Sequence, residues 1–161
     1  MTIEIHYLAD LPEHAPMLAQ WHFAQWQHFV EGDSGERRLR LLRERANHCA
    51  VPTVLIAVDG SQLLGSATLA EFDMETRRDL TPWMADVFVA PEFRRCGIAS
   101  ALVHRIVGEA ADLGVAKLYL WTTGAMREAL YAGLGWSVLE RPMYQGVERA
   151  LMSIVPSRAP R

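Results

Sequence analysis

The chain has 161 residues, of which 50% are hydrophobic and 22% are charged, and its formal net charge is -3. This length is typical of one domain, and the apolar content is sufficient for a core that needs neither metals nor disulfides. The small negative charge, without a basic stripe, argues against a nucleic-acid partner and weakly favours a neutral or cationic one.

The first third of the chain predicts a strand and then a helix. Apolar and polar residues alternate over 3–7, as they do in a short strand. Asp10 stands three residues before Glu13, with Pro12 between them, so we expect the first helix to begin there with a capping box. Its apolar face is expected to contain Met17, Leu18, Trp21 and Phe29.

A second helix and a hairpin are expected next. Ser34 follows a loop at 31–33 and is expected to cap a helix that runs to about His48. Two β-rich runs at 52–58 and 62–71 flank an Asp-Gly dipeptide, which is typical of a tight hairpin turn.

The middle of the chain predicts a loop, a strand and a long helix. The charged stretch 73–79 is expected to be a surface loop, and 83–89 an apolar strand. From Gly97 onward apolar residues recur at helical spacing, and Gly114 is expected to end that helix.

The last third predicts a strand at 117–122, a short helix at 125–132, and a hairpin formed by 136–141 and 147–155. The order of elements is β-α-α-β-β-β-α-β-α-β-β. Hairpins combined with one parallel crossover imply a mixed α/β (α+β) sheet with helices on its faces. We expect one domain over residues 1–156, followed by a frayed tail at 157–161.

The sequence also carries expectations about the cellular compartment. Cys49 and Cys96 are the two cysteines, too few for a disulfide framework, so we expect free thiols in a reducing compartment. The amino terminus does not resemble a secretory signal, and no apolar stretch is long enough to span a bilayer. We therefore expect a cytoplasmic protein without a membrane partner.

The most informative segment follows the strand at 83–89. A turn containing Arg94, Arg95 and Gly97 leads directly into a helix, whose free N–H groups and positive dipole end form an anion site. Gly97 has no Cβ and Ala99 is small, so a diphosphate can approach the backbone, and Arg94 adds a charged fork. Taken alone, the hexapeptide is equally compatible with a plain turn and solvated arginines.

Two signatures in the chain resemble those of the GNAT acetyltransferase superfamily, and the resemblance covers nearly the whole sequence. The first is Arg/Gln-x-x-Gly-x-Gly/Ala, met here at 94–99 after a strand that ends in Val-Ala-Pro-Glu. The second is a short helix that contains Tyr131, followed by Leu-Gly-Trp at 134–136. The resemblance implies a single N-acetyltransferase domain with about four helices. Its sheet would have about seven mostly antiparallel strands, with a bulge in the fourth and a splayed fourth and fifth pair.

The resemblance further implies that acetyl-CoA is the co-substrate. Its diphosphate would lie on the turn, and its pantetheine arm between the splayed strands. A backbone N–H near Val89 would hold the thioester carbonyl. The coenzyme A-binding residues implied in this way are Val87, Phe88, Val89, Arg94, Arg95, Cys96, Gly97, Ile98, Ala99 and Ser100.

Direct attack by a primary amine of a small molecule or peptide is the family's usual route. Tyr131 matches the family's proton donor to the leaving thiolate, although it also suits a packed aromatic position. Asp86 is the candidate proton acceptor, but a structural salt bridge would explain it as well. Glu71 and Asp73 are alternative acceptors through a water. Cys96 lies at the diphosphate end, too far from the thioester for an acetyl-cysteine route. The six histidines show no metal-ligand spacing, so we expect no metal.

The acceptor pocket is expected between the first two helices, their loop and the last hairpin. Trp21, His22 and Trp26 would form aromatic walls unless they pack in the core. Glu31 and Asp33 would form a negative rim, which favours a polyamine-like or aminoglycoside-like cation over a peptide.

Some questions stay open from the sequence. It does not identify the acceptor or decide between a monomer and a homodimer. The chain has no G-x-G-x-x-G and no G-K-[ST], so a Rossmann dehydrogenase and a P-loop NTPase are excluded. A catalytically silent acyl-CoA sensor on the same fold, and a non-catalytic interaction domain, are the alternatives.

Overall fold

A seven-stranded sheet in the order β1-β2-β3-β4-β5-β9-β6 forms the frame of the protein. The structure, a computed structural model, describes residues 1–158. The parallel pair is β4–β5, and the other neighbours in this sheet are antiparallel. The strands are β1 (Glu4–Tyr7), β2 (Thr53–Asp59), β3 (Gln62–Ala70), β4 (Trp83–Val89), β5 (Leu118–Thr122), β6 (Ser137–Glu140) and β9 (Ala150–Ile154). A separate two-stranded ribbon pairs β7 (Met143–Tyr144) with β8 (Val147–Glu148).

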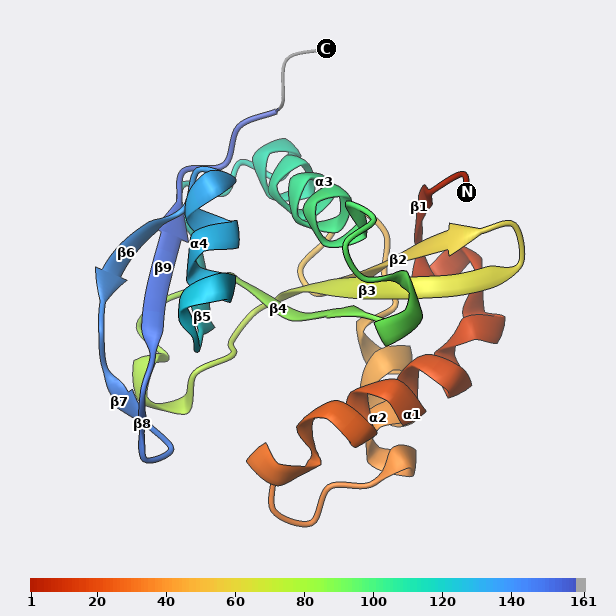
Figure 1. Ribbon diagram of the computed structural model, residues 1–161, viewed down its shortest axis with the longest axis horizontal. Helices are drawn as coiled ribbons and strands as arrows, with labels where there is room; N and C mark the ends of the chain where they lie inside the picture. Colours follow the sequence, from red (N-terminus) through yellow and green to blue (C-terminus); the bar gives the residue numbers. More distant parts are fainter. Residues whose placement is uncertain (159–161) are drawn as a thin grey trace.

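Helices cover both faces of the sheet (Figure 1). One face packs against α1 (Ala15–Trp26) and α2 (Gly35–Arg45), and the other against α3 (Ile98–Asp112) and α4 (Ala125–Gly133). Because successive side chains of a strand point to opposite faces, β2 supplies both cores. Leu55 faces α3, whereas Val54 and Ile56 face α1 and α2. The predicted mixed, mostly antiparallel fold with four helices is confirmed.

The predicted cap of the second helix is confirmed, but that of the first is wrong. Ser34 accepts a hydrogen bond from the Arg37 N–H at 3.0 Å and starts α2. Ahead of α1 the chain forms two 3-10 turns, η1 (Leu8–Asp10) and η2 (Pro12–His14), without a side-chain cap. The Asp10 carboxylate instead contacts His48 Nε2 at 2.6 Å, so it does not bond to the backbone of a first helical turn.

Two residues assigned to the apolar face of α1 lie elsewhere. Met17 is 51% exposed, and Phe29 belongs to a separate 3-10 turn, η3 (Gln27–Phe29), after the helix ends. The expected surface loop at 73–79 is also only partly exposed, because Met74 is buried against Trp83 and Leu151.

The strand β4 has the predicted bounds, and the predicted hairpin of β2 and β3 is present. Part of the predicted frayed tail, residues 159–161, lies outside the described residues; before it, Arg158 Nε donates to Asp112 Oδ1 at 2.5 Å. Among residues 1–158, no helix has the length and apolar character needed to cross a membrane.

Candidate functional site

The strand β4 contains a bulge at its centre. Ser66 of β3 pairs with Phe88, but Thr68, two residues further on, pairs with Ala85, so β4 has one residue more than its partner here. Asp86 lies in this bulge with φ +53°, a left-handed conformation that costs energy for a residue with a side chain. Strained backbone of this kind is concentrated at functional sites.

The bulge changes which face each side chain of β4 occupies. Met84 packs in the α3-side core, and regular alternation would place Phe88 there too. Instead Phe88 contacts Trp21 and Trp26 of α1, while Val87 and Val89 pack on the α3 side. One extra residue therefore moves Phe88 to the α1 side of the sheet.

Gly65 of β3 fits closely against the end of β4. A Cβ at this position would lie 2.4 Å from the Phe88 carbonyl oxygen, which is backbone and has little freedom to move. The Ala90 N–H donates to the Leu64 carbonyl at 3.0 Å in the same region. These contacts hold the end of β4 against β3, on the side away from β5.

The strands β4 and β5 separate after a single ladder pair. Within residues 1–158 that pair is Trp83 with Tyr119, and the Tyr119 N–H donates to the Pro82 carbonyl at 3.2 Å. The edge of β4 from the bulge to Val89 therefore has no strand neighbour on the β5 side. An extended group could add to this edge as a further strand does.

The turn before α3 has the geometry of an anion site. Gly97 precedes the helix with φ +79°, and a Cβ there would meet no atom within 4 Å. The first intrahelical bond runs from the Ala101 N–H to the Gly97 carbonyl, so the N–H groups of residues 98–100 have no intrahelical partner. Arg95 and Cys96 are exposed beside this opening. The space and the donors fit a diphosphate.

Two of the predicted coenzyme A residues have an additional structural role. The Arg94 Nε donates to the Val89 carbonyl at 3.0 Å, so this side chain ties the turn to the end of β4. Ile98 is buried in the core at 1% exposure, so only its backbone faces the opening.

Tyr131 of α4 lies in the same core as Val89 and Ile98. It is 8% exposed and packs edge-on against Trp136, with ring centroids 6.3 Å apart. Burial raises the pKa of its phenol, so the hydroxyl keeps its proton at neutral pH. Within the described residues the hydroxyl makes no hydrogen bond. Tyr131 can therefore hold and donate a proton.

Two carboxylates meet on the α2 side of the bulge. Asp86 Oδ2 lies 3.5 Å from Arg45 Nη1, and both side chains are about four-fifths buried. Burial and the nearby charge of Asp86 raise the pKa of the Asp73 carboxyl well above its usual range, although Arg45 and Arg38 oppose this shift. A carboxylate with a raised pKa is a stronger base than an exposed one, so Asp73 is well suited to accept a proton.

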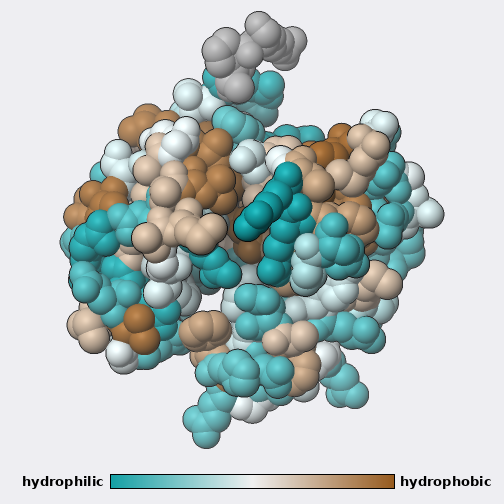
Figure 2. All heavy atoms as spheres, viewed as in Figure 1, coloured by the Kyte–Doolittle hydropathy of each residue, from teal (hydrophilic) through white to brown (hydrophobic). Residues whose placement is uncertain are grey.

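Aromatic side chains lie beside Asp73 on the side of β5. Trp121 of β5 donates from its indole N–H to the Asp73 carbonyl at 3.2 Å. Its ring lies 6.3 Å from that of Phe29 and 5.4 Å from that of Tyr144. Gln145 Nε2 reaches the Phe29 carbonyl at 3.4 Å, so η3 meets the β7–β8 ribbon. Figure 2 shows this face of the molecule hollowed between the part that carries β5 to β9 and α1 below.

The predicted negative rim of the acceptor pocket is wrong for Asp33. Its side chain is 1% exposed and is bonded to Arg38 at 2.8 Å and Arg37 at 2.9 Å. Burial works against ionisation, but these arginines outweigh it and lower the pKa of Asp33. Glu31, by contrast, is exposed.

Of the three residues predicted as aromatic walls, His22 is part of the core. His22 is 1% exposed, and its Nε2 lies 2.9 Å from Ser66 Oγ. Burial lowers the pKa of His22 to about 4, so the ring is neutral at pH 7. Trp21 and Trp26 are partly buried around Phe88.

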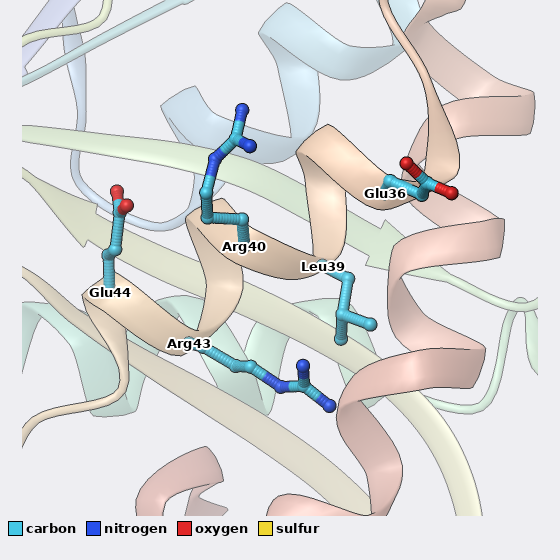
Figure 3. Close-up of a pocket in the computed structure, with 5 residues that line it drawn as sticks. All are labelled: Glu36, Leu39, Arg40, Arg43 and Glu44. Carbon is cyan, nitrogen blue, oxygen red and sulfur yellow. The ribbon is translucent and has the colours of Figure 1, made fainter.

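Sequence reasoning missed Trp121, Tyr144 and Arg149 as site residues. They come from separate segments that only the fold brings together, and no local pattern marks them. A cavity of about 500 Å³ lies away from this site, beside Glu36, Leu39, Arg40, Arg43 and Glu44. Figure 3 shows that all five side chains belong to one helix, α2, so this cavity has no second wall and is apart from the site. Among residues 1–158 there is no group of three or more His, Cys, Asp or Glu side chains that could hold a metal ion.

Comparison with known proteins identifies this arrangement. The model of the acetyltransferase (GNAT) family matches residues 11–136. The chain therefore belongs to the GNAT acetyltransferase family and is an acyltransferase by class. A comparison with curated proteins finds no match.

Solved structures share the fold across their full length. A structure of YncA from Salmonella typhimurium with its cofactor acetyl-CoA is 16% identical, with a TM-score of 0.74, over 100% of this chain and 98% of that one. An aminoglycoside 6'-acetyltransferase of type Ii is 20% identical, with a TM-score of 0.72, over 99% and 100%. A chimera of the spermidine N-acetyltransferase SpeG from Vibrio cholerae and hSSAT is 17% identical, with a TM-score of 0.69, over 97% and 96%. At these identities the likeness concerns the fold.

Proposed function

We propose that this chain is an acetyl-CoA-dependent N-acetyltransferase that acts on the primary amine of a small molecule or peptide by direct attack. The observation that carries the proposal is the bulge of β4, which contains Asp86, interacts with the charge of Asp73 and leads along the strand to the anion site at 94–99. One edge of one strand thus combines a place for the diphosphate, an unpaired backbone and a proton acceptor.

Acetyl-CoA supplies the activated acetyl group, and the chain supplies its binding site. The free N–H groups of residues 98–100 and the guanidinium of Arg95 would hold the diphosphate, with Arg94 fixing the turn on Val89. The backbone of residues 87–89 would bond to the pantetheine amides, and a backbone N–H near Val89 would stabilise negative charge on the thioester oxygen. The exposed thiols of Cys49 and Cys96 suit a reducing compartment, so we place the activity in the cytoplasm.

The proton steps belong to side chains on either side of β4. An amine must lose a proton to act as a nucleophile, and Asp73 accepts it directly or through one water. Asp86 raises the affinity of Asp73 for that proton by its own charge, and it shares the acceptor role through their proximity. Tyr131, on the α4 side, donates a proton to the departing thiolate.

The proposal is tested by mixing the protein with acetyl-CoA and a library of primary amines and following the release of free thiol. We expect amine-dependent thiol release and an acetylated product detected by mass spectrometry. In Asp86→Asn we expect a lower maximal rate with the affinity for acetyl-CoA retained. Binding of acetyl-CoA without thiol release for any amine in the library would refute catalysis and identify an acyl-CoA sensor instead.

A further inference from the structure

Arg149, between β8 and β9, is a buried arginine that has no acidic partner among residues 1–158. It is 5% exposed. Its Nε donates to the Tyr144 carbonyl at 3.1 Å and its Nη1 to Thr123 Oγ1 at 2.6 Å. Within residues 1–158 no carboxylate lies within 4.0 Å of it, and its Nη2 makes no hydrogen bond. The other arginine buried to this degree, Arg38, is paired with Asp33.

An anion at the Nη2 edge would compensate for the partial burial of this charge. A guanidinium withdrawn from water loses hydration that neutral acceptors replace only in part. The guanidinium makes cation–π contacts with the rings of Phe29 and Trp121. The ring centroids lie 5.7 Å and 5.1 Å from the guanidinium carbon. Stacking leaves the edge of the guanidinium open for a planar anion such as a carboxylate.

A cavity of about 210 Å³ lies beside Arg149. It is lined by the end of β5, the start of α4 and three residues of the last segment, Arg141, Glu148 and Ala150. Gly124 precedes α4 with φ +97° and no side chain caps the helix, so the first N–H groups of α4 add positive potential.

The acids that border the cavity do not neutralise Arg149. Glu128 is held by Arg141, with Nη2 2.5 Å from Oε1, and that contact lowers the pKa of Glu128. Glu148 is exposed and beyond ion-pair distance of Arg149. Arg149 is therefore the buried charge in the cavity wall that lacks a counter-ion among the described residues.

Trp121 connects Arg149 to the proposed site of proton transfer. Trp121 donates from its indole nitrogen to the Asp73 carbonyl, and its ring faces Arg149 on the other side. Trp121 belongs to β5, the strand that separates from β4. Trp121 therefore contacts both the backbone of Asp73 and the guanidinium of Arg149.

We infer that the acceptor carries a carboxylate as well as its amine, as a free amino acid does, and that Arg149 binds this carboxylate while Asp73 faces the amine. The inference rests on the proposed function and specifies its substrate class. An uncompensated buried arginine in the acceptor site also repels polycations, so a polyamine or aminoglycoside is disfavoured.

The test compares matched substrates that differ only in the carboxylate. Each L-amino acid is assayed against its decarboxylated amine, for example L-phenylalanine against phenethylamine and L-methionine against 3-methylthiopropylamine, with spermidine as a polycation. For the wild type we expect kcat/KM for the best amino acid to exceed that of its amine by about a hundredfold. This difference should come from a lower KM for the amino acid, with similar kcat values.

Arg149→Lys and Arg149→Met should remove most of this preference by raising KM for the amino acid. Their kcat/KM for the decarboxylated amine should fall far less than that for the amino acid, and calorimetry should give wild-type affinity for acetyl-CoA. The control is Arg43→Met, an exposed arginine of α2 in the cavity of Figure 3, which should retain the full preference.

A second measurement uses the unaltered protein, because Arg149 also ties Tyr144 to Thr123 and its variants could fail to fold. The coenzyme A complex should bind N-acetyl-L-methionine more tightly than the N-acetylated amine of the same side chain. Equal binding, or equal kcat/KM for amine and amino acid, overturns the carboxylate inference while the N-acetyltransferase proposal stands. If no amine of any kind releases thiol, the proposed function fails, and the binding comparison alone decides whether this cavity selects carboxylates.

Discussion

At the scale of single residues, Asp73 and Asp86 show how two nearby carboxylates acquire different tasks. Asp86 has a guanidinium beside it, at 3.5 Å, whereas burial and the charge of Asp86 dominate the environment of Asp73. The sequence offered both as proton acceptors and favoured Asp86 because of its place in the strand. That preference could not anticipate Arg45, which comes from the far end of α2 and meets Asp86 only in the folded chain.

Asp73→Asn is expected to lower the maximal rate by about a hundredfold or more and to remove the acidic limb of the pH–rate profile. The neutral amide has the shape of the acid but cannot accept the proton. Steady-state kinetics between about pH 5 and 9 measure both effects. A profile that keeps its acidic limb would show that Asp73 is not the base.

The same substitution should also change stability, with a definite sign. The pKa of Asp73 is raised on folding, so the folded state binds this proton more tightly than the unfolded chain does. Stability is therefore lost as pH rises from the unfolded pKa, about 3.9, through the folded value. Asp73→Asn should melt at a higher temperature than wild type above that range, and the gain should shrink as pH falls. A lower melting temperature at pH 8 would mark Asp73 as a structural acid.

Tyr131→Phe should lower kcat by about 10²–10⁴-fold while the dissociation constant for acetyl-CoA stays near the wild-type value. The ring keeps its packing against Trp136, and only the hydroxyl is lost. Stopped-flow turnover and calorimetry on one preparation separate the two quantities. Full turnover in this variant at neutral pH would mean that Tyr131 serves packing and that water protonates the thiolate.

At the scale of elements, the sequence predicted correctly the features that depend only on residues close together in the chain. The bounds of β4 and the Ser34 cap of α2 follow from an apolar run and from one hydroxyl that accepts a backbone bond. The start of α1 was misplaced because Asp10 is bonded to His48, 38 residues away. The bulge in β4 was expected from the family resemblance alone. Its effect on which face holds Phe88 depends on pairing with β3, which no single strand encodes.

The turn before α3 supports a prediction at this scale. Gly97→Asp puts a negative side chain into the open space at the helix start. We expect the affinity for acetyl-CoA to fall by about tenfold or more, roughly 1.4 kcal/mol. Gly97→Asn is the matched control, since it imposes the same left-handed strain and nearly the same shape without the charge. Equal calorimetric affinities for both variants would place the diphosphate elsewhere.

At the scale of the whole molecule, the sheet consists of two parts joined at one ladder pair. The two parts run from β1 to β4 and over β5, β9 and β6. Apart from the pair Trp83–Tyr119, they are joined by side-chain packing in the α3-side core and around Met74, Trp83 and Leu151, and by the Trp121 hydrogen bond to the Asp73 carbonyl. Composition and element order indicated the sheet, but the juxtaposition of Arg149 with Trp121 and Phe29 could not be predicted. Those three residues have no relation in sequence, and their contact is a product of tertiary packing.

The gap between β4 and β5 supports a prediction about ligand and stability. A ligand that binds only the folded chain stabilises it, and acetyl-CoA at a hundred times its dissociation constant should do so by about 2.7 kcal/mol. For a chain of this size that is a rise in melting temperature of roughly 5–10 °C. Differential scanning calorimetry measures it, with acetyl-CoA and, at the same concentration, with 3'-phosphoadenosine 5'-diphosphate, which keeps the phosphates and lacks the pantetheine arm. A rise as large with the pantetheine-free fragment would show that the junction is not bridged.

Gly65 finally limits which substitutions the sequence can accept. It touches no proposed ligand, yet every alternative residue would place a Cβ 2.4 Å from the Phe88 carbonyl oxygen. Relief of that clash would push β4 away from β3 and toward the gap beside β5, narrowing the slot in which we propose that the pantetheine binds. In a library of random variants selected for acetyl transfer, position 65 should tolerate as few substitutions as a residue that carries the proton. A survey of mutational tolerance would then count it as part of the active site, for a reason that lies entirely in the backbone behind it.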